Sequence, residues 1–419
     1  MQISIPSQSS SLQDWLSYLE KIHPKTIDMG LERVAKVANA LGYIDNPSKI
    51  ILVAGTNGKG TTCRLLEALL LAQGYSVGTY ASPHLVRYNE RVRVNGKELS
   101  DQYHVDAFHE IEQGRGTTSL SYFEYGTLGG LSIFKRLSVD YVVLEVGLGG
   151  RFDATNIVNP YASVITTIDL DHKEYLGDTR EKVGYEKAGI FRKGIPAIVG
   201  DLNIPDSVTK YGKDIEADLV LSGRDFRFEP DRTCFKWTYN NQTHEFLNPA
   251  IPAQNAATAL TVLAKLDLLP EIDLVKQVLA NLTVEGRFQC LSTQPLVYTD
   301  VAHNPESARY LASKLQEFVD KGFKIHALVA MLCDKDKANA IAPLIDVVDS
   351  WTVATLQGQR TEPASVLADH IRSVSTNPVE TALDVSQALD SLLPRCAEKD
   401  VVIVFGSFYT VAKAIEYWQ

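Results

Sequence analysis

A glycine-rich segment with a single lysine, Gly55-Thr56-Asn57-Gly58-Lys59-Gly60-Thr61, has the residue types best suited to chemistry. Glycines let the backbone come close to an anion, so that main-chain N–H groups can point at phosphate oxygens, and Lys59 adds a cation. The segment follows the apolar run KIILVA and precedes TTCRLLEALLLAQGY, which has helical spacing. It is therefore predicted to join a strand to the N-terminus of a helix and to bind the phosphates of ATP.

The loop departs from the Walker pattern G-x-x-x-x-G-K-[ST]. Val53 occupies the first glycine position and Gly60 follows the lysine. The hydroxyl that would approach a metal ion is therefore shifted by one residue, to Thr61 or Thr62. The alternative to a phosphate loop is a glycine-rich turn with a solvated lysine.

Polar side chains also fall where other predicted strands end. Ser82 closes SVGTYAS, Glu145 lies in VVLEVG, and His172 follows TTID. Open α/β sheets place their ligands at the carboxyl ends of strands, which makes these residues candidates for a site. Each has a simpler alternative, since Ser82 precedes a proline and His172 could be a structural histidine. Lys187 sits beside Glu186 on a predicted helix, where a solvated charge pair is the ordinary interpretation.

Strands that alternate with helices predict an α/β fold with a mostly parallel sheet. The N-terminal part, residues 1–287, is predicted to be a phosphate-loop ATPase domain, with an antiparallel insertion at about 219–246. A second strand–helix series predicts a smaller, Rossmann-like α/β domain over residues 288–419, with a short hinge at 284–287. The strands are expected at KIILVAG, SVGTYAS, YVVLEVG, ASVITTID and PAIVG, and then at PLVYTD, KIHALVAML, SWTVATL and DVVIVFG.

Composition argues against several classes of protein. The 419 residues carry a formal net charge of -10, and no dense run of Lys and Arg is present, so nucleic acid is not an expected partner. No apolar stretch has the roughly 18 residues or more that would span a membrane, and the N-terminus has no signal-peptide pattern. The 5 cysteines lack any CxxC pair. We expect a cytoplasmic protein with reduced thiols.

The shifted loop GTNGKGT, together with GGRFDATN, EKAGI and DVAHNP, resembles the Mur ligase superfamily of ATP-dependent amide ligases. Within it, the chain is most similar to the branch of folylpolyglutamate synthases and dihydrofolate synthases. The resemblance implies that ATP phosphorylates a carboxylate to an acyl phosphate, which the amine of L-glutamate then attacks. Such chemistry needs positioning, Mg²⁺ and cations around the transferring group rather than a protein nucleophile.

The resemblance also implies roles for particular residues. Lys59, His172 and Lys187 are the implied catalytic residues, and Lys187 is implied to be carbamylated and to hold the second of two Mg²⁺ ions. Nitrogen ligation by His172 also allows Mn²⁺. The implied metal ligands are Ser82, Glu145, His172 and Lys187. The implied nucleotide contacts are Gly55, Thr56, Asn57, Gly58, Lys59, Gly60, Thr61, Asn255, Arg287 and Asp300. Because Arg287 and Asp300 lie at the hinge and in the C-terminal domain, we expect ATP to be held by both domains.

Three segments, at residues 26–34, 121–127 and 149–156, are implied to bind the acceptor, as dihydropteroate first and reduced folates such as tetrahydrofolate second. Phe123 and Phe152 could stack on a flat heteroaromatic ring, although core packing is the alternative for both, and Asp28 or Asp153 could accept its N–H groups. The implied residues are Thr26, Ile27, Asp28, Met29, Ser121, Tyr122, Phe123, Glu124, Arg151, Phe152 and Asp153.

Two rival functions stay open at this point. One is a folylpolyglutamate synthase, or another Mur-type ligase, without activity on dihydropteroate. The other is a phosphate-loop ATPase or kinase of a different class. We expect the chain to act as a monomer.

Overall fold

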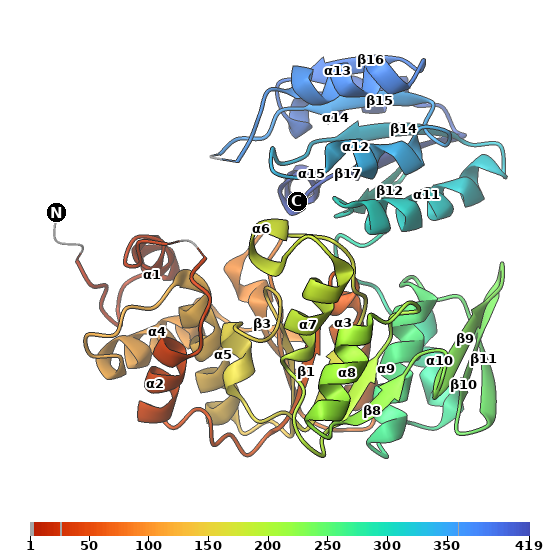
Figure 1. Cartoon of the computed structure of the whole chain (residues 1–419). Helices are drawn as coiled ribbons and strands as arrows, with labels where there is room; N and C mark the ends of the chain where they lie inside the picture. The colour runs from red at the N-terminus through yellow and green to blue at the C-terminus, as the bar shows by residue number, and fades with distance from the viewer. Residues whose placement is uncertain (1–3, 26, 359) are drawn as a thin grey trace. The chain divides into compact units, whose positions relative to one another are not determined.

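The computed structural model describes residues 4–25, 27–358 and 360–419. The chain divides into two compact units (Figure 1). The larger contains the residues up to His84 and Tyr88–Leu282, and the smaller contains Leu85–Arg87 and Thr283–Gln419.

The larger unit is built on an eight-stranded sheet with the order β4-β3-β2-β5-β1-β6-β7-β8. The six strands from β2 to β8 in this order are parallel, whereas β3 and β4 form an antiparallel hairpin at the edge. A mostly parallel sheet was predicted and is confirmed. The strands are β1 (Lys49–Ala54), β2 (Val77–Tyr80), β3 (Val92–Val94), β4 (Lys97–Glu98), β5 (Tyr141–Glu145), β6 (Ala162–Ile165), β7 (Pro196–Val199) and β8 (Asp218–Leu221).

Helices pack on both faces of this sheet, which explains why the central strands β1, β5 and β6 are buried along nearly their whole length. Ile50, Leu52 and Ala54 of β1 join one core with side chains of α1, α2, α4, α5, α7 and α8. Alternation along the strand turns Ile51 and Val53 to the other face, where α3 lies against β1, β2 and β5 and also packs on α9 and α10. The helices are α1 (Leu12–Leu19), α2 (Glu32–Ala40), α3 (Lys59–Ala72), α4 (Asp101–Gly114), α5 (Tyr122–Leu137), α6 (Lys173–Leu176), α7 (Arg180–Ala188), α8 (Asp206–Asp214), α9 (Ala253–Lys265) and α10 (Ile272–Asn281).

The predicted antiparallel insertion is present as a three-stranded sheet, β11-β10-β9. Its strands are β9 (Phe226–Pro230), β10 (Cys234–Tyr239) and β11 (Gln242–Leu247). The expected start at 219 was too early, because residues 219–221 belong to β8, which pairs in parallel with β7. Trp237 of β10 donates from Nε1 to Thr261 Oγ1 of α9 at 3.0 Å, so the inner face of the insertion is fixed to that helix.

The smaller unit has a six-stranded sheet with the order β12-β13-β17-β14-β15-β16, parallel except for the pairing of β12 with β13. This is the predicted second α/β series, with an antiparallel edge strand added. Its strands are β12 (Gln289–Thr293), β13 (Leu296–Asp300), β14 (Lys324–Val329), β15 (Ser350–Ala354), β16 (Val379–Ala382) and β17 (Asp400–Phe405). Its helices are α11 (Pro305–Val319), α12 (Lys337–Ile341), α13 (Ala364–Val374), α14 (Val385–Leu392) and α15 (Phe408–Tyr417).

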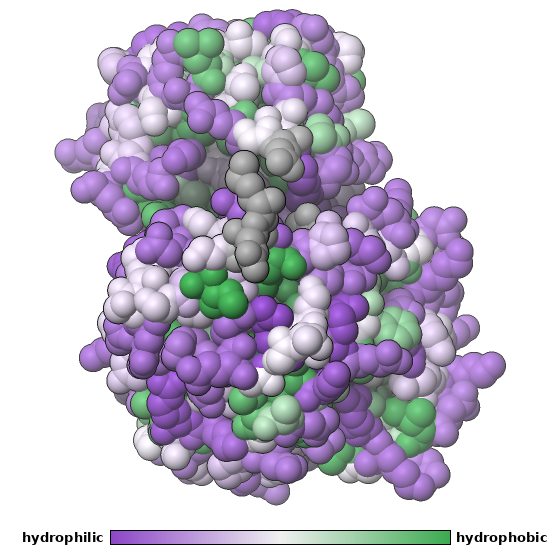
Figure 2. Space-filling view, turned by 90° about the vertical axis from the view of Figure 1, so that its left-hand side faces the viewer, coloured by the Kyte–Doolittle hydropathy of each residue, from purple (hydrophilic) through white to green (hydrophobic). Residues whose placement is uncertain are grey.

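The molecular surface is mostly polar on the side that Figure 2 shows, with hydrophobic residues in small separate groups. Across the described ranges, no helix combines the length and the apolar character that a membrane crossing requires.

Candidate phosphate-loop site

The predicted phosphate loop lies between β1 and α3, at the centre of the parallel sheet. Gly58 is the N-cap residue of α3 with a φ of 82°, a left-handed conformation that glycine adopts without strain. A Cβ on Gly55 would lie 1.8 Å from Thr166 Oγ1, so only glycine fits this close approach. The helix N-terminus and its main-chain N–H groups therefore face the carboxyl edge of the sheet, as phosphate binding requires.

Residues that follow β6 hold this loop from the side. Thr56 N donates to Thr167 O at 2.8 Å, and Asn57 N donates to Thr167 Oγ1 at 3.0 Å. Thr166 Oγ1 in turn donates to Asn57 O at 2.6 Å. Sequence reasoning assigned no role to Thr166 or Thr167, although both stand in the segment TTID from which His172 was selected. Their position directly after a buried strand was the available signal.

The lysine and the threonine of the loop are both held by neighbours. Lys59 Nζ donates to the carbonyl oxygens of Gly55 and Thr56 at 2.9 and 3.1 Å, so the ammonium group lies over the loop. Asn255 of α9 is buried and donates from Nδ2 to Thr61 Oγ1 at 2.8 Å. The structure thus brings Asn255 to the loop, as a support for Thr61.

Two of the predicted metal ligands lie together beside the loop. Ser82 follows β2 and Glu145 ends β5, and these strands are neighbours in the sheet. Ser82 N donates to Glu145 Oε2 at 3.3 Å, and the same oxygen is 3.8 Å from the position that a Cβ on Gly60 would take. A carboxylate and a hydroxyl next to a phosphate loop suit Mg²⁺, which prefers oxygen ligands and keeps several waters.

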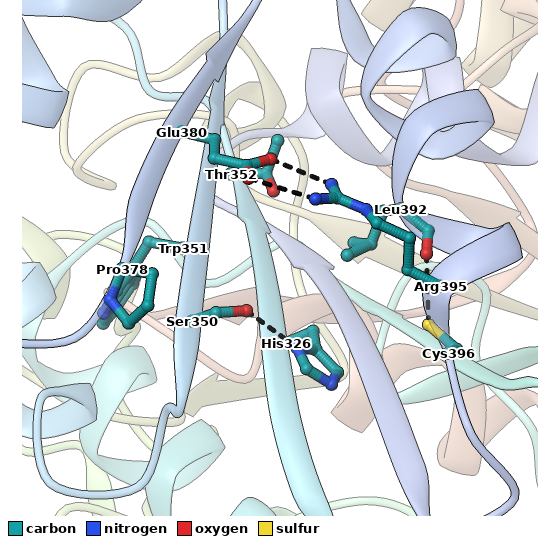
Figure 3. Close-up of a pocket in the computed structure, with 9 residues that line it drawn as sticks. All are labelled: His326, Ser350, Trp351, Thr352, Pro378, Glu380, Leu392, Arg395 and Cys396. Atoms are coloured by element: carbon teal, nitrogen blue, oxygen red, sulfur yellow. Dashed lines mark hydrogen bonds and ion pairs between the residues drawn. The ribbon is translucent and has the colours of Figure 1, made fainter.

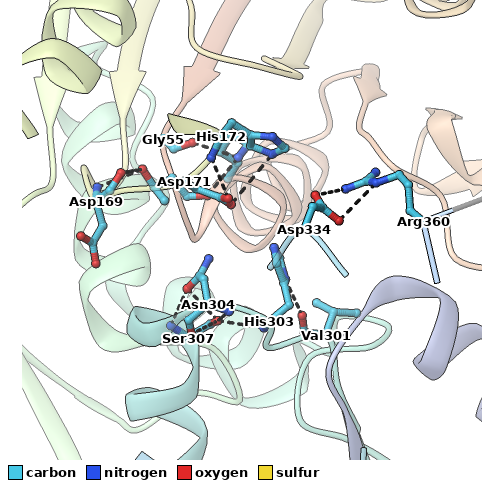
Figure 4. Close-up of polar contacts among 12 residues, drawn as sticks. Gly55, Asp169, Asp171, His172, Val301, His303, Asn304, Ser307, Asp334 and Arg360 are labelled. Carbon is cyan, nitrogen blue, oxygen red and sulfur yellow. Dashed lines mark hydrogen bonds and ion pairs between the residues drawn. The ribbon is translucent and has the colours of Figure 1, made fainter. Parts of the chain in front are cut away.

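The other two predicted ligands lie on neighbouring helices of the same unit. His172 is the N-cap residue of α6 with a φ of 49°, and Asp171 Oδ2 lies 3.9 Å from its Nε2 (Figure 4). Lys187, on α7, is 3% exposed. In the parts of the chain that the structure describes, no three His, Cys, Asp or Glu side chains come together as a metal cluster. A metal site here would rely on Ser82, water and phosphate oxygens, or on a modified lysine, so the roles of His172 and Lys187 stay predictions.

The three predicted acceptor segments meet near the N-terminus of α5. Thr26 lies outside the described residues. Ser121 is the N-cap residue of α5, and Ser121 and Glu124 cap each other's main-chain N–H at 3.3 and 2.7 Å. Ile27 and Phe152 are 39% and 47% exposed, so both present apolar surface to solvent. Met29 approaches the neighbouring loop, since its Cε is 3.5 Å from the position of a Cβ on Gly149.

Several of these side chains also have structural contacts. Phe123 packs on the main chain of Gly147, where an added Cβ would come within 2.5 Å of its ring. Its neighbour Tyr122 faces the guanidinium of Arg91, whose Cζ is 5.5 Å from the ring centroid. Arg151 lies between the rings of Tyr185 and Tyr211, with its Cζ 4.2 and 4.5 Å from their centroids.

Asp153 is buried and accepts hydrogen bonds from Leu148 N at 2.8 Å and from Thr155 N at 3.0 Å. Burial raises the pKa of Asp153, and these hydrogen bonds oppose the rise. The residue therefore shapes its own loop. Its contact with an acceptor, like that of the other residues in these segments, stays a prediction.

His84, which follows the Ser82-Pro83 turn, accepts a hydrogen bond at Nδ1 from Arg91 Nε at 2.8 Å. Burial, followed by the charge of Arg91, lowers the pKa of His84 to about 4. The ring is therefore neutral at physiological pH, and its proton is on Nε2.

The smaller unit contains the last two predicted nucleotide contacts, Arg287 and Asp300. Asp300 ends β13 and accepts from Phe288 N and Ala302 N at 2.9 and 2.8 Å. Burial raises its pKa, and the charge of Arg287 works against that rise. Arg287 Cζ lies 5.4 Å from the centroid of the Phe408 ring. Both assignments to the nucleotide stay predictions.

His303, in DVAHNP, lies in the loop between β13 and α11. Its Nδ1 is 2.8 Å from Val301 O, and its main-chain N donates to Ser307 Oγ at 3.2 Å (Figure 4). Figure 4 also shows Arg360 paired with Asp334, the first residue of the sequence DKD.

A separate pocket of about 190 Å³ lies in the smaller unit, at the amino ends of β14 and β15 (Figure 3). His326 Nδ1 is 2.7 Å from Ser350 Oγ, and Arg395 makes two bonds to Glu380 at 3.0 and 2.8 Å. No predicted site residue lines this pocket. It is therefore distinct from the candidate site.

Comparison with known proteins connects this geometry with a family. The Mur ligase middle domain matches residues 53–264, and the Mur ligase glutamate ligase domain matches residues 286–408. A relative from Escherichia coli (strain K12), dihydrofolate synthase/folylpolyglutamate synthase, is 45% identical over 414 residues, which are 98% of this chain and 96% of the relative.

Solved structures agree with this match. That of E. coli FolC in complex with DHPP and ADP has a TM-score of 0.94 at 45% identity, and the alignment covers 98% of both chains. A bifunctional folylpolyglutamate synthase/dihydrofolate synthase with Mn, AMPPNP and L-glutamate bound has a TM-score of 0.92 at 44% identity, over 99% of both chains. The predicted resemblance is confirmed. Because a full-length match of this kind accompanies a phosphate loop of the shifted form, the chain belongs to the Mur ligase family and, within it, to the dihydrofolate synthase/folylpolyglutamate synthases.

Proposed function

We propose that this enzyme uses ATP to join L-glutamate to dihydropteroate, which forms dihydrofolate, and to reduced folates, which forms polyglutamates. The observation that carries this proposal is the phosphate loop beside Glu145 and Ser82, in a chain aligned over 98% of its length with enzymes of this name. Of the similar proteins, one has been solved with DHPP and ADP, and another with Mn, AMPPNP and L-glutamate.

The loop residues bind and orient ATP in this reaction. Main-chain N–H groups of Gly58 to Thr61 and the ammonium group of Lys59 face the phosphates, where they stabilise the charge that develops as the terminal phosphoryl group moves to the acceptor carboxylate. Lys59 would leave the carbonyls of Gly55 and Thr56 for phosphate oxygens. Asn255 keeps Thr61 in place.

Mg²⁺, when bound, neutralises phosphate charge and orients the phosphoryl group. We assign Glu145 and Ser82 to one ion, and His172 with a carbamylated Lys187 to a second. Burial of the Lys187 side chain supports this assignment, because carbamylation converts a buried ammonium into an oxygen ligand with the opposite charge. For the acceptor, we assign the exposed apolar surfaces of Ile27 and Phe152 to its flat ring.

One assay tests the proposal and separates it from its rivals. ADP release should require both L-glutamate and either dihydropteroate or tetrahydrofolate. Dependence on tetrahydrofolate alone would restrict the enzyme to folylpolyglutamate synthesis. ATP turnover that is indifferent to glutamate would point to an ATPase or kinase instead. We also propose that the enzyme is a cytoplasmic monomer, and sedimentation of the purified protein tests the oligomeric state.

A further inference from the structure

An ion network centred on Arg33 ties together two of the acceptor segments. Arg33, on α2, places its Nη1 3.0 Å from Asp28 Oδ2 and donates from Nη2 to Glu124 Oε1 at 3.0 Å. The same Nη2 donates to the carbonyl oxygen of Asp28 at 2.9 Å. The planar guanidinium therefore joins residues 27–30 of the first acceptor segment, here called the 27–30 segment, to the first turn of α5. Glu124, its partner there, is 91 residues after Arg33 in the chain.

Glu124 has both of its carboxylate oxygens engaged. Oε2 accepts the main-chain N–H of Ser121 at 2.7 Å and so caps α5, and Oε1 accepts Arg33. The side chain of Glu124 is only 3% exposed. A carboxylate this deeply buried needs a cation beside it. Arg33 is that cation, and its guanidinium also pairs with Asp28 of the 27–30 segment.

Both carboxylate oxygens of Asp28 also have partners. His23 Nε2 lies 3.1 Å from Oδ2, and Lys25 Nζ donates to Oδ1 at 3.2 Å. Burial raises the pKa of Asp28, but the hydrogen bonds from Lys25 and His23 and the charge of Arg33 outweigh it and lower the pKa overall. His23 is held in turn by Ser119 Oγ, 2.8 Å from its Nδ1. Asp28 thus joins its segment to the rest of the unit through two routes.

A main-chain contact completes the arrangement. Gly30 N donates to Phe152 O at 3.0 Å, so the 27–30 segment is joined to the third acceptor segment as well. Arg33 and Asp28 are the side chains that fix the segment between the two others.

We propose that Arg33 is a positioning residue for the pteroate-type acceptor: through Asp28 and Glu124 it holds the 27–30 segment in the geometry that binds this substrate. In this proposal Asp28 stabilises the conformation of the 27–30 segment instead of accepting N–H groups of the ligand. The inference rests on the proposed function, and it gives a role to Arg33, which lies within the predicted segment 26–34 but is not among the individual acceptor contacts expected from the sequence. A segment held in its binding conformation before the ligand arrives avoids an ordering cost on binding, which is why affinity for the acceptor should depend on Arg33.

The test compares R33M and R33K with the wild-type enzyme in steady-state assays that vary dihydropteroate, ATP and L-glutamate separately. R33M removes the cation, and R33K keeps the charge but cannot bridge two carboxylates with a planar fork. We expect R33M to raise KM for dihydropteroate by about tenfold or more while the KM values for ATP and L-glutamate stay within about twofold, with R33K in between. The matched control is R115M, because Arg115 is also a partly buried arginine paired with a glutamate, Glu112 at 2.6 Å. Its other hydrogen bonds go to Tyr18, Gly116 and Thr118, so it bridges neither Asp28 nor Glu124. R115M should lower the melting temperature without changing the ratio of the KM values.

Two results would overturn the inference. One is an unchanged KM for dihydropteroate in R33M or R33K, and the other is an equal change in all three KM values, as for a general loss of folded protein. If R33M does not fold, R33K still decides the question. Failure of the proposed function is recognised separately, since the wild-type enzyme would then release no glutamate-dependent ADP, and the inference would fall with it.

Discussion

Replacing Gly58 with alanine adds one methyl group at the N-terminus of α3, and the chain contains a matched control glycine at the other end of that helix. Gly58 has a φ of 82° and Gly74, just beyond the C-terminus of α3, has a φ of 87°. Any side chain in this left-handed region costs roughly 1–2 kcal/mol. A Cβ on Gly74 meets nothing within 4 Å, whereas a Cβ on Gly58 would lie 2.5 Å from Asn255 Oδ1 and 2.6 Å from its Nδ2. Both variants therefore have the same free-energy cost for the left-handed backbone, and only G58A has an additional steric cost.

The steric cost follows from what Asn255 does. Its side chain is 3% exposed and donates to Thr61 Oγ1 at 2.8 Å, so it cannot retreat without losing that bond. Leaving buried polar groups without partners costs about 1–3 kcal/mol, and each kcal/mol lowers the melting temperature of a unit of this size by roughly 2–4 °C. We expect G58A to melt roughly 2–12 °C below G74A.

The assay is thermal unfolding of both variants, followed by measurement of KM for ATP. G58A should raise KM for ATP at least about tenfold, which corresponds to ~1.4 kcal/mol, because the first N–H groups of α3 and Thr61 are displaced together. G74A should keep KM within about twofold of the wild-type value, since its methyl group points into open space. Equal melting temperatures for the two variants, with wild-type KM in both, would refute the reasoning about Asn255.

Three further predictions concern the metal site and pH. E145Q removes the ligand charge and keeps its shape, so the Mg²⁺ concentration for half-maximal activity should rise by at least about tenfold; an unchanged Mg²⁺ titration would exclude Glu145 as a ligand. K187A should abolish ligase turnover at saturating ATP, whereas K182A, which changes an exposed lysine on the same helix, should not; near wild-type turnover in K187A would disprove carbamylation as a requirement. Burial lowers the pKa of His104 from its ordinary 6.5 to about 4. Between these values the unfolded chain binds the proton and the folded protein does not, so stability should fall as pH drops from 6.5 towards 4. Urea unfolding of H104F should show a shallower decline over that window, and identical pH profiles would contradict the assignment.

Local patterns predicted the elements that consist of local interactions. The apolar run before Gly55 and the helical spacing after Thr61 placed the phosphate loop correctly between β1 and α3. Alternation and turn residues revealed the three-stranded insertion. The predicted start of that insertion was wrong because residues 219–221 form a strand through pairing with β7. The sequence of so short a segment does not reveal which strand it pairs with.

The contacts that build the site are long-range, and a single sequence does not encode them visibly. Asn57 meets Thr167 across 110 residues, and Arg33 meets Glu124 across 91. Resemblance to a family supplied Asn255, but it could not show that Asn255 bonds to Thr61. In the same way, the sequence offered Asp28 as a possible acceptor of substrate N–H groups, but it could not show that His23, Lys25 and Arg33 contact its carboxylate.

The hydrogen bond between Asn255 and Thr61 also has a consequence for protein synthesis. It spans 194 residues, and at about 5–20 residues per second the ribosome needs about 10–40 s to produce α9 after the loop has been made. β1, the strand before the loop, is central in the sheet and pairs on both sides with strands made later, β5 and β6. During that interval the nascent chain has the residues for nucleotide binding without the partners that hold them, so the phosphate loop can mature only when about three-fifths of the polypeptide exists.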